Sequence, residues 1–534
     1  MNYKITLISI VILAYILRFY HLGQIPPSIN WDEASNGYNA YSILKTARDE
    51  YGIFLPLYNR SFDDYKPPLY MYLSIPSVKY FGLTELAVRI PSAILGTLLV
   101  LIMYFFTKKL FTSQKVAMIA SFLLAIASWN IHFSRVGFES NIGLFFGFTA
   151  MTLLLYSLPH KGEEMAKKNI LLLILSSTFL ALSFYSYHSA RIFIPIIFAV
   201  FVIIYRKEFL SMPKKFIFLF FTIPIILIAP FFVTAPGEAI RQRYQTVSLG
   251  AQKESTDDFI KYVQQDSGSF FSRQIHNRRI LIFSTYLQNY LSHFNPEFLF
   301  ISGDRNLRHH TEGSGMLPLF FMPLILIGLY KFIKKHDKTS LVILSWLLAS
   351  PIAAAPADAA PHAVRSIFMS VGLITAATVG LKTVIDTARL RTLAIIALAV
   401  AVLFYLFTYL HSYYLHYPRD KAEFWMYGFK EAVVESMKLR DQYPVINVDA
   451  SIEQGYIFWL FYNKYDPFAY QSSTAKPNIY NFSFNDNKVN EGELYVSLAD
   501  HFLPDLKLVK TVYYPNGNEA IKIGRKRYSW ENEN

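Results

Sequence analysis

Two adjacent carboxylates, Asp32 and Glu33, are the first residues in this sequence whose types and spacing could do chemistry. They occur in the segment INWDEASNGYNAYSIL, residues 29–44, shortly after the first long apolar run. Charged side chains this close to a membrane surface are seldom left without a partner or a role. A carboxylate beside a bound hydroxyl group could act as a general base, so both residues are candidate catalytic residues.

The same segment has a structural interpretation. Asn30 and Glu33 have the spacing of a helical capping box, in which the Glu33 carboxylate would accept a hydrogen bond from the backbone amide of Asn30. Asp32 is not needed for that box. Because neighbouring helical residues point about 100° apart, the two carboxylates cannot both reach one atom. We expect one of them to hold the start of the helix while the other does chemistry.

A lysine follows in the segment DDYKPPLYMYL, residues 63–73. Each proline disfavours helix in the residue before it, so Lys66 is predicted to lie on extended backbone. A lysine held in this way near a membrane surface could bind a lipid phosphate as a compact charge. The alternative is a lysine that extends along apolar surface beside a structural turn.

Three further segments combine histidine, arginine and acidic residues. They contain His132, Arg135 and Glu139 (residues 130–141), Asp304, Arg305, Arg308, His309 and His310 (residues 302–315), and His362 and Arg365 (residues 350–366). Adjacent histidines suggest a metal, but helical spacing and an evident third ligand are missing. Arginine contacts to an anion are the stronger interpretation, and charges that pair with one another are the alternative.

The elements that must position these residues are membrane spans. Of 534 residues, 53% are hydrophobic and 17% charged, and the mean hydropathy is +0.27. A soluble enzyme of this size would need a very apolar surface. About eleven apolar runs approach the length of a span; they are 5–20, 88–106, 116–131, 142–158, 170–187, 192–205, 216–235, 317–333, 341–356, 364–381 and 392–411. The first run has no small-residue cleavage site, which favours a retained anchor over a signal peptide.

The positions of the basic residues predict the orientation. With the N-terminus in the cytoplasm, the short cytoplasmic connections would hold most of the lysines, such as Lys108 and Lys109, Lys214 and Lys215, and Lys334 and Lys335. This is the asymmetry of the positive-inside rule. It also accounts for the excess of 51 basic over 38 acidic residues. A clustered basic face for nucleic acid is not apparent, so nucleic-acid binding is not expected.

This topology places three hydrophilic segments outside the cytoplasm, and they hold the candidate residues. They are the outer loops 21–87 and 236–316 and the tail after residue 411. In the tail, a helix over 421–439, a strand at PVINV, an aromatic helix over 453–463 and strands at LKLVKTVYY and EAIKI predict a small soluble α/β domain. The predicted organisation is a membrane domain over 1–411 and an extracytoplasmic domain over 412–534. The absence of cysteine means that no disulfide holds this domain.

Five segments together resemble a known family. WDEASNGYNAYSI, YKPPLYMYL, FSRVGFESN, GDRNLRHH and HAVRS, in this order, are similar to motifs of the protein O-mannosyltransferase-like family of GT-C membrane glycosyltransferases (glycosyltransferase family 39-like). That family includes the bacterial aminoarabinose transferase. The resemblance covers roughly residues 1–411. It implies an α-helical polytopic GT-C fold and an inverting, single-displacement transfer from a polyprenyl-phosphate sugar to an extracytoplasmic lipid, glycan or protein acceptor at the cell membrane.

The resemblance also implies roles for single residues. Asp32 matches the catalytic base, Lys66 the lysine that binds the donor phosphate, and Glu139 a second acidic position. Arg135 and Arg365 are further candidates for contacts to the donor phosphate. The other candidate site residues are His132, Arg308, His310 and His362.

Several alternatives stay open. The adjacent Asp32 and Glu33 without a set of further carboxylates favour a reaction that needs no cofactor, with a divalent metal as the alternative. A flippase or transporter of lipid-linked sugars would also need a polar cavity, but its ionisable residues should occur near mid-membrane. A non-catalytic membrane scaffold is the other alternative.

Overall fold

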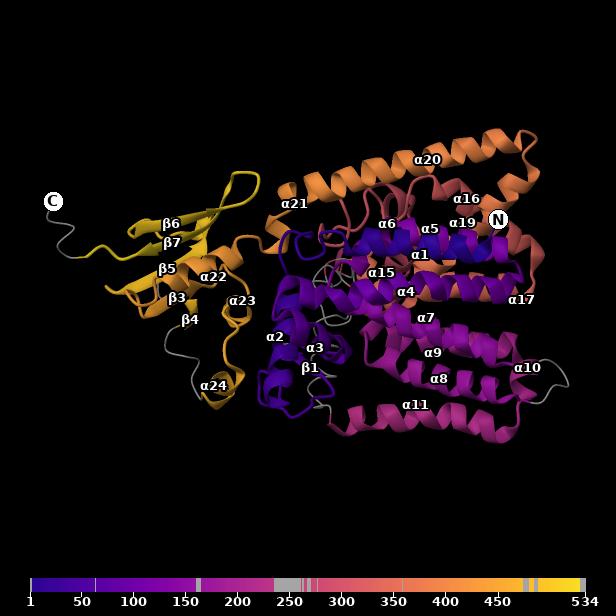
Figure 1. Cartoon of the computed structure of the whole chain (residues 1–534), viewed down its shortest axis with the longest axis horizontal. Helices are drawn as coiled ribbons and strands as arrows, with labels where there is room; N and C mark the ends of the chain where they lie inside the picture. Colours follow the sequence, from indigo (N-terminus) through magenta and orange to yellow (C-terminus); the bar gives the residue numbers. More distant parts are fainter. Residues whose placement is uncertain are drawn as a thin grey trace.

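The computed structural model describes residues 2–62, 64–159, 165–234, 261, 264–266, 270–275, 277–357, 359–473, 480–484 and 488–528. Most of the predicted outer loop 236–316 before residue 277 lies outside these residues. Figure 1 shows a long helical bundle with a small mixed sheet at one end. The predicted combination of a helical membrane protein and a C-terminal sheet is confirmed.

The first half of the chain forms most of the helical bundle. Its elements are α1 (Tyr3–Phe19), α2 (Trp31–Thr46), β1 (Asn59–Ser61), β2 (Asp64–Lys66), α3 (Leu69–Phe81), α4 (Glu85–Phe111), α5 (Gln114–Ile126), α6 (Ser128–Ser134), α7 (Glu139–Ser157), α8 (Lys167–Phe184), α9 (His188–Ile204), α10 (Arg206–Leu210) and α11 (Lys214–Thr234). The capping box predicted at Asn30 is present, because Asn30 Oδ1 accepts from Glu33 N at 2.9 Å and Glu33 Oε2 accepts from Asn30 N at 3.2 Å.

The second half completes the bundle and adds the sheet. Its helices are α14 (Phe270–Ile275), α15 (Arg278–Ser292), α16 (Phe321–Lys335), α17 (Lys338–Ala349), α18 (Ala363–Ser366), α19 (Met369–Thr387), α20 (Arg391–His411), α21 (Tyr417–Asp420), α22 (Phe429–Lys438), α23 (Gly455–Tyr462) and α24 (Pro467–Ser472). Its strands are β3 (Val445–Asp449), β4 (Tyr480–Phe484), β5 (Glu493–Leu498), β6 (Lys507–Tyr513) and β7 (Glu519–Arg525).

Six described helical segments are long and apolar enough to cross a membrane. They are α4, α7, α8, α11, α19 and the stretch Arg391–Asp420. The pair α5 and α6, bent by 60°, makes seven if it counts as one span. The predicted number of about eleven is larger, because several apolar runs form helices too short for this criterion. For example, α17 has 12 residues and ends before Pro351, where a helix is disfavoured.

The sheet has the strand order β4-β3-β5-β7-β6. Strand β3 is parallel to β4 and β5, whereas β7 is antiparallel to β5 and β6. The predicted strands and the aromatic helix of the tail are therefore confirmed. The predicted helix over 421–439 is shorter, since α22 begins at Phe429 after Gly428, whose φ of +95° is a left-handed conformation.

The sheet end of the molecule packs directly on the first outer loop. Tyr38 Oη on α2 donates to the carbonyl of Tyr465 at 3.2 Å, and Gln471 Nε2 donates to Ser42 Oγ at 2.9 Å. Gly37 allows this close approach, because a Cβ at that position would lie 2.6 Å from Phe461 and Val88. The boundary predicted at residue 412 stays a prediction, and the last candidate span continues to Asp420.

Candidate active site

A cavity of about 540 Å³ gathers most of the predicted site residues. The predicted residues that line it are Asp32, Lys66, Glu139, Arg308, His362 and Arg365. They come from α2, β2, the start of α7, the loop after α15 and α18. Segments far apart in the sequence thus supply one carboxylate-rich and cation-rich space, as expected for a site that binds an anion beside a base.

Asp32 and Lys66 form the central pair of the cavity. Lys66 Nζ donates to Asp32 Oδ1 in an ion pair in which the Lys66 side chain is 16% and the Asp32 side chain 31% exposed. Lys66 lies in β2, as predicted for extended backbone before two prolines. Hydrogen bonds from Ser61 Oγ to Ser35 Oγ (3.0 Å) and from Asn59 Nδ2 to Asn36 Oδ1 (3.2 Å) attach the β1–β2 hairpin to α2. The hairpin therefore fixes the lysine opposite the carboxylate.

Glu139 is the second carboxylate of the cavity. It is 8% exposed and accepts a hydrogen bond from Asn36 Nδ2 on α2 at 2.9 Å. Asp32 on α2, Lys66 on β2 and Glu139 on α7 therefore line the same cavity. Both carboxylates act on the charge of Lys66. The carboxylates keep the lysine charged, and Asp32 is the more open of the two toward the cavity.

Glu33 has a different environment from its neighbour. It is fully buried and does not line the cavity among the described residues. Its Oε1 accepts from Arg89 Nε and from Gly137 N, both at 2.9 Å, and its Oε2 accepts from Asn30 N. This supports the structural alternative for Glu33, whereas a catalytic role has no direct support from its position.

Arg89 was not identified from the sequence, although it holds this region together. Its guanidinium is fully buried and also donates to the carbonyls of Leu22 (3.2 Å), Pro26 (2.8 Å) and Ser28. The signal was present, because a charged residue at the edge of an apolar run needs a buried partner.

Besides Glu33, three more predicted residues lie outside the cavity lining. Arg135 is buried and donates to the carbonyls of Leu17 (3.1 Å), Tyr20 (2.7 Å) and Ile25 (3.1 Å). His132 is bonded through both ring nitrogens, to Tyr413 Oη at 3.0 Å and to the Arg308 carbonyl at 2.6 Å. His310 contacts the carbonyl of Thr311 at 3.1 Å. These contacts hold loops and the start of the tail in place.

Arg308 and Arg365, which line the cavity, are better placed than Arg135 to bind an anion there. Arg308 lies over the ring of Trp31 at 4.7 Å. Among the described residues, Arg365 makes no side-chain hydrogen bond or ion pair, and it lies half-buried at the cavity. A guanidinium in this setting can donate to two oxygens of one phosphate.

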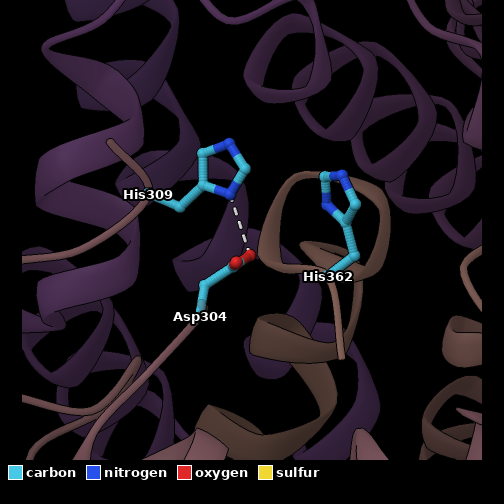
Figure 2. Close-up of side chains that lie close together, drawn as sticks. All are labelled: Asp304, His309 and His362. Carbon is cyan, nitrogen blue, oxygen red and sulfur yellow. Dashed lines mark hydrogen bonds and ion pairs between the residues drawn. The ribbon is translucent and has the colours of Figure 1, made fainter. Parts of the chain in front are cut away.

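The loops that carry these arginines are tied together by Asp304. Its Oδ2 accepts from His309 Nδ1 at 2.8 Å and from the backbone N–H of Ala363 at 2.6 Å. Figure 2 shows Asp304, His309 and His362 close together. The sequence pointed to the adjacent histidines, but it could not show that His362, from a different loop, lies beside them.

Burial and neighbouring charges shift the pKa values of Lys66, Asp304 and His362. Burial lowers the pKa of Lys66, but the Asp32 and Glu139 carboxylates outweigh it and raise the pKa above its usual value. Burial would raise the pKa of Asp304, but His309 outweighs it, so this pKa lies well below its usual value. Burial, followed by His309 and Arg365, lowers the pKa of His362 well below its usual value. The cavity at neutral pH therefore holds a charged lysine and a neutral His362.

Comparison with known proteins agrees with this architecture. Residues 8–240 match the family model described as dolichyl-phosphate-mannose-protein mannosyltransferase (PMT). This match includes Asp32, Lys66 and Glu139, but not the loops of Arg308 and Arg365. No functionally curated protein matches the sequence.

Solved structures share the fold at low sequence identity. ArnT from Cupriavidus metallidurans, in its apo state, has a TM-score of 0.59 and 11% identity over 97% of both chains. The same protein bound to undecaprenyl phosphate has a TM-score of 0.59 and 12% identity, again over 97% of both chains.

The Archaeoglobus fulgidus oligosaccharyltransferase is a second structural relative. In the form tethered with an acceptor peptide it has a TM-score of 0.52 and 17% identity, over 89% of this chain and 64% of its own. The chain thus spans less than two thirds of the length of that enzyme. Residues 8–240 are therefore similar to the PMT family, and the chain as a whole shares the fold of ArnT.

Proposed function

We propose that this protein is an inverting glycosyltransferase that moves a sugar from a polyprenyl-phosphate donor to an extracytoplasmic acceptor. The observation that carries the proposal is the ion pair between Asp32 and Lys66 inside a cavity that also contains Arg308 and Arg365. A base and several cations at one place are what transfer from a phosphate leaving group requires.

Asp32 is the proposed general base. Its carboxylate takes the proton of the acceptor hydroxyl while the hydroxyl oxygen attacks the anomeric carbon of the sugar. The bond between that carbon and the phosphate oxygen breaks, and the polyprenyl phosphate leaves with the electron pair. Asp32 is the better candidate than Glu33, because its side chain is 31% exposed to the cavity whereas Glu33 is fully buried against Arg89.

Lys66, Arg308 and Arg365 are the proposed phosphate ligands. In the structure Lys66 donates to Asp32, and a donor phosphate could take over this hydrogen bond. That exchange would leave the Asp32 carboxylate free to act on the acceptor. Charge-assisted hydrogen bonds from the two arginines would then stabilise the charge that develops on the departing phosphate.

An apolar groove next to the cavity suits the lipid part of the donor. The groove, about 230 Å³ in volume, lies between α8, α9 and α11, and includes Leu180, Ile194, Phe198 and Ile225. Helix α9 connects the two sites, because His188 at its start lines the polar cavity and Ile194, farther along it, lines the groove. A polyprenyl chain could thus lie in the groove with its phosphate in the cavity.

The proposed orientation places this cavity outside the cytoplasm. The N-terminus and α10 lie at the end of the bundle opposite to the sheet (Figure 1). Lysine-bearing helix ends meet there, since Lys338 pairs with Glu208 and Thr339 Oγ1 donates to the Leu110 carbonyl. By the positive-inside rule this end is cytoplasmic.

Transfer from radiolabelled polyprenyl-phosphate sugars tests the proposal. The purified protein in lipid nanodiscs is mixed with a panel of such donors and with crude cell envelope as the acceptor. We expect label to pass to the envelope with one donor and unlabelled undecaprenyl phosphate to compete. A protein that binds the lipid phosphate, moves the labelled donor between leaflets of a vesicle and transfers no sugar would instead be a flippase.

A further inference from the structure

The C-terminal tail supplies a residue to the wall of the cavity. This residue, Gln454, directly precedes α23, and among the described lining residues it is the one that follows position 411. Gln454 is exposed, and its side chain does not cap α23. In the described part of the chain its amide has no hydrogen-bond partner, so it is available to a ligand in the cavity.

Gln454 has a backbone conformation that residues with a Cβ seldom adopt. Its φ of +54° and ψ of +29° are left-handed, which brings the Cβ close to the following carbonyl oxygen. Phe62, which also lines the cavity, has a φ of +61°. Such strained residues persist only where the surrounding structure fixes them, and they cluster at ligand sites. Two segments far apart in the sequence therefore each place a strained residue at this cavity.

The backbone around Gln454 is held on the sheet of the tail. Ser451 Oγ accepts from Leu498 N at 3.2 Å, which attaches the segment to β5. A Cβ at Gly455 would lie 3.1 Å from Val448 Cγ1, so the chain after Gln454 packs closely on β3. The amide therefore projects from a fixed backbone, which lowers the entropic cost of binding a ligand.

The same segment is fixed relative to the proposed base and the proposed phosphate ligand. Helix α23, which begins after Gln454, packs on α2, the helix that carries Asp32 (Figure 1). The ring centroid of Phe62 lies 6.0 Å from that of Tyr456 on α23 and 5.8 Å from Lys66 Nζ. Gln454, Asp32 and Lys66 therefore belong to one packed unit.

We propose that Gln454 is an acceptor-specificity residue, which binds a hydroxyl group of an uncharged sugar next to the hydroxyl that Asp32 deprotonates. This inference rests on the proposed function, because it names the acceptor of that reaction. An amide side chain has a C=O acceptor and an NH₂ donor, so it can bond two neighbouring hydroxyls. A sugar offers such hydroxyls beside the reacting one. In a serine or threonine acceptor, the single side-chain hydroxyl is the one that reacts.

The charges around Gln454 favour an uncharged acceptor. The adjacent Glu453 is exposed, and its carboxylate is near enough to act on Arg308. Burial lowers the pKa of Arg308, and the Asp32 and Glu453 carboxylates oppose this effect. A phosphorylated or carboxylated acceptor beside Gln454 would therefore meet a carboxylate, which disfavours its binding.

Transfer kinetics with defined acceptors test the proposal. The acceptors are a panel of methyl glycosides of neutral sugars and a peptide that contains serine and threonine. Each is offered with the polyprenyl-phosphate donor to the full-length protein in nanodiscs. We expect transfer to a methyl glycoside. Gln454→Gly should raise the KM for that glycoside about 3–10-fold, the equivalent of one neutral hydrogen bond, while the KM for the donor stays unchanged.

Three variants separate loss of the amide from loss of the fold. Gln454→Gly removes the amide but suits the left-handed backbone, so its thermal midpoint should not fall. Gln454→Asn keeps the amide on a shorter side chain and tolerates this conformation, so it should restore part of the acceptor affinity. Gln442→Ala is the matched control, because Gln442 is exposed in the same tail but does not line the cavity.

Two further readouts separate this inference from the proposed function. Release of free sugar from the donor by water, without an acceptor, should be equal in wild type and Gln454→Gly. Saturation-transfer NMR measures binding of the methyl glycosides without a donor, and its signal should fall in Gln454→Gly and persist in Gln442→Ala. This NMR result in a protein that transfers no sugar would count against the proposed function only.

Three results would overturn the inference. One is a Gln454→Gly protein that keeps the wild-type KM and NMR signal for the glycoside. Another is a wild-type protein that neither binds nor glycosylates any methyl glycoside, including one that transfers sugar to the peptide alone. The third is a parallel loss of donor hydrolysis and transfer in Gln454→Gly, which would show that Gln454 acts on the donor.

Discussion

Two adjacent acidic residues, Asp32 and Glu33, have separate environments because the helix turns by about 100° between them. Glu33 lies inward and accepts hydrogen bonds from Arg89 and Gly137, whereas Asp32 lies at the cavity with Lys66. The sequence predicted this division through the capping box. It could not predict Arg89 as the partner, because that residue comes from the next long helix.

Replacement of Glu33 is expected to affect stability more than catalysis. Glu33→Gln leaves the buried Arg89 guanidinium without its counter-charge, and breaking a buried pair costs about 3–5 kcal/mol. The thermal midpoint of the detergent-solubilised protein should fall, while activity per folded molecule is retained. Asp32→Asn, the matched neighbour, should lower the midpoint less, because its side chain is 31% exposed and Glu139 still stabilises the Lys66 charge. An inactive but fully stable Glu33→Gln protein would contradict the structural role.

Two arginines predicted to bind the donor phosphate are expected to behave differently. Arg365→Ala removes a half-buried guanidinium that faces the cavity, so the affinity for undecaprenyl phosphate should fall roughly 10–100-fold, the equivalent of a charged hydrogen bond. Arg135→Ala leaves the carbonyls of Leu17, Tyr20 and Ile25 without a donor, so it should lower stability instead. Binding isotherms and thermal unfolding of both variants measure this, and equal losses of affinity would contradict the assignment.

Elements with local signals were predicted correctly. The start of α2, the extended backbone at Lys66 and the strands of the tail depend on caps, prolines and alternation within a few residues. Contacts between elements could not be predicted in this way. The meeting of His362 with Asp304 and His309 depends on two loops about fifty residues apart, and no local pattern encodes their proximity.

The packing of α16 on α19 gives a prediction at the scale of helices. A Cβ at Gly380 would lie 1.8 Å from the Leu324 carbonyl oxygen, so the two backbones touch at this point. Gly380→Ala should force the helices apart and lower the thermal midpoint. Gly372→Ala on the same helix is the control, because the atoms nearest to its Cβ would belong to the side chains of Leu347 and Trp346 and not to a backbone. Equal effects of the two substitutions would contradict this packing.

The whole molecule has a lysine-rich end and a sheet-bearing end, and the proposed orientation can be tested because the chain has no cysteine. Asp500→Cys places a thiol at an exposed position of the sheet end, and Lys335→Cys places one at the opposite end. In right-side-out spheroplasts, a membrane-impermeant maleimide should label the first protein directly and the second only after permeabilisation. The reverse pattern would place the cavity in the cytoplasm.

The C-terminal part is expected to be necessary for the fold of the site. The ring centroid of Trp425 lies 5.9 Å from the Arg89 guanidinium carbon, and Tyr417 Oη donates to the Leu307 carbonyl at 2.9 Å. A chain ending at residue 411 would lose both contacts and expose buried polar groups. It should therefore bind undecaprenyl phosphate weakly or unfold. Unchanged donor affinity in the truncated protein would show that the tail is separate from the site.

The most direct test of the central claim is sugar transfer by wild type and Asp32→Asn in nanodiscs, with donor affinity measured for both. The account predicts that the variant folds and binds the polyprenyl-phosphate donor but transfers sugar at least about 100-fold more slowly, since general-base catalysis contributes about 10²–10⁴-fold. Equal transfer rates in the two proteins would contradict the assignment of Asp32 as the base and would make Glu139, the other carboxylate of the cavity, the next residue to replace.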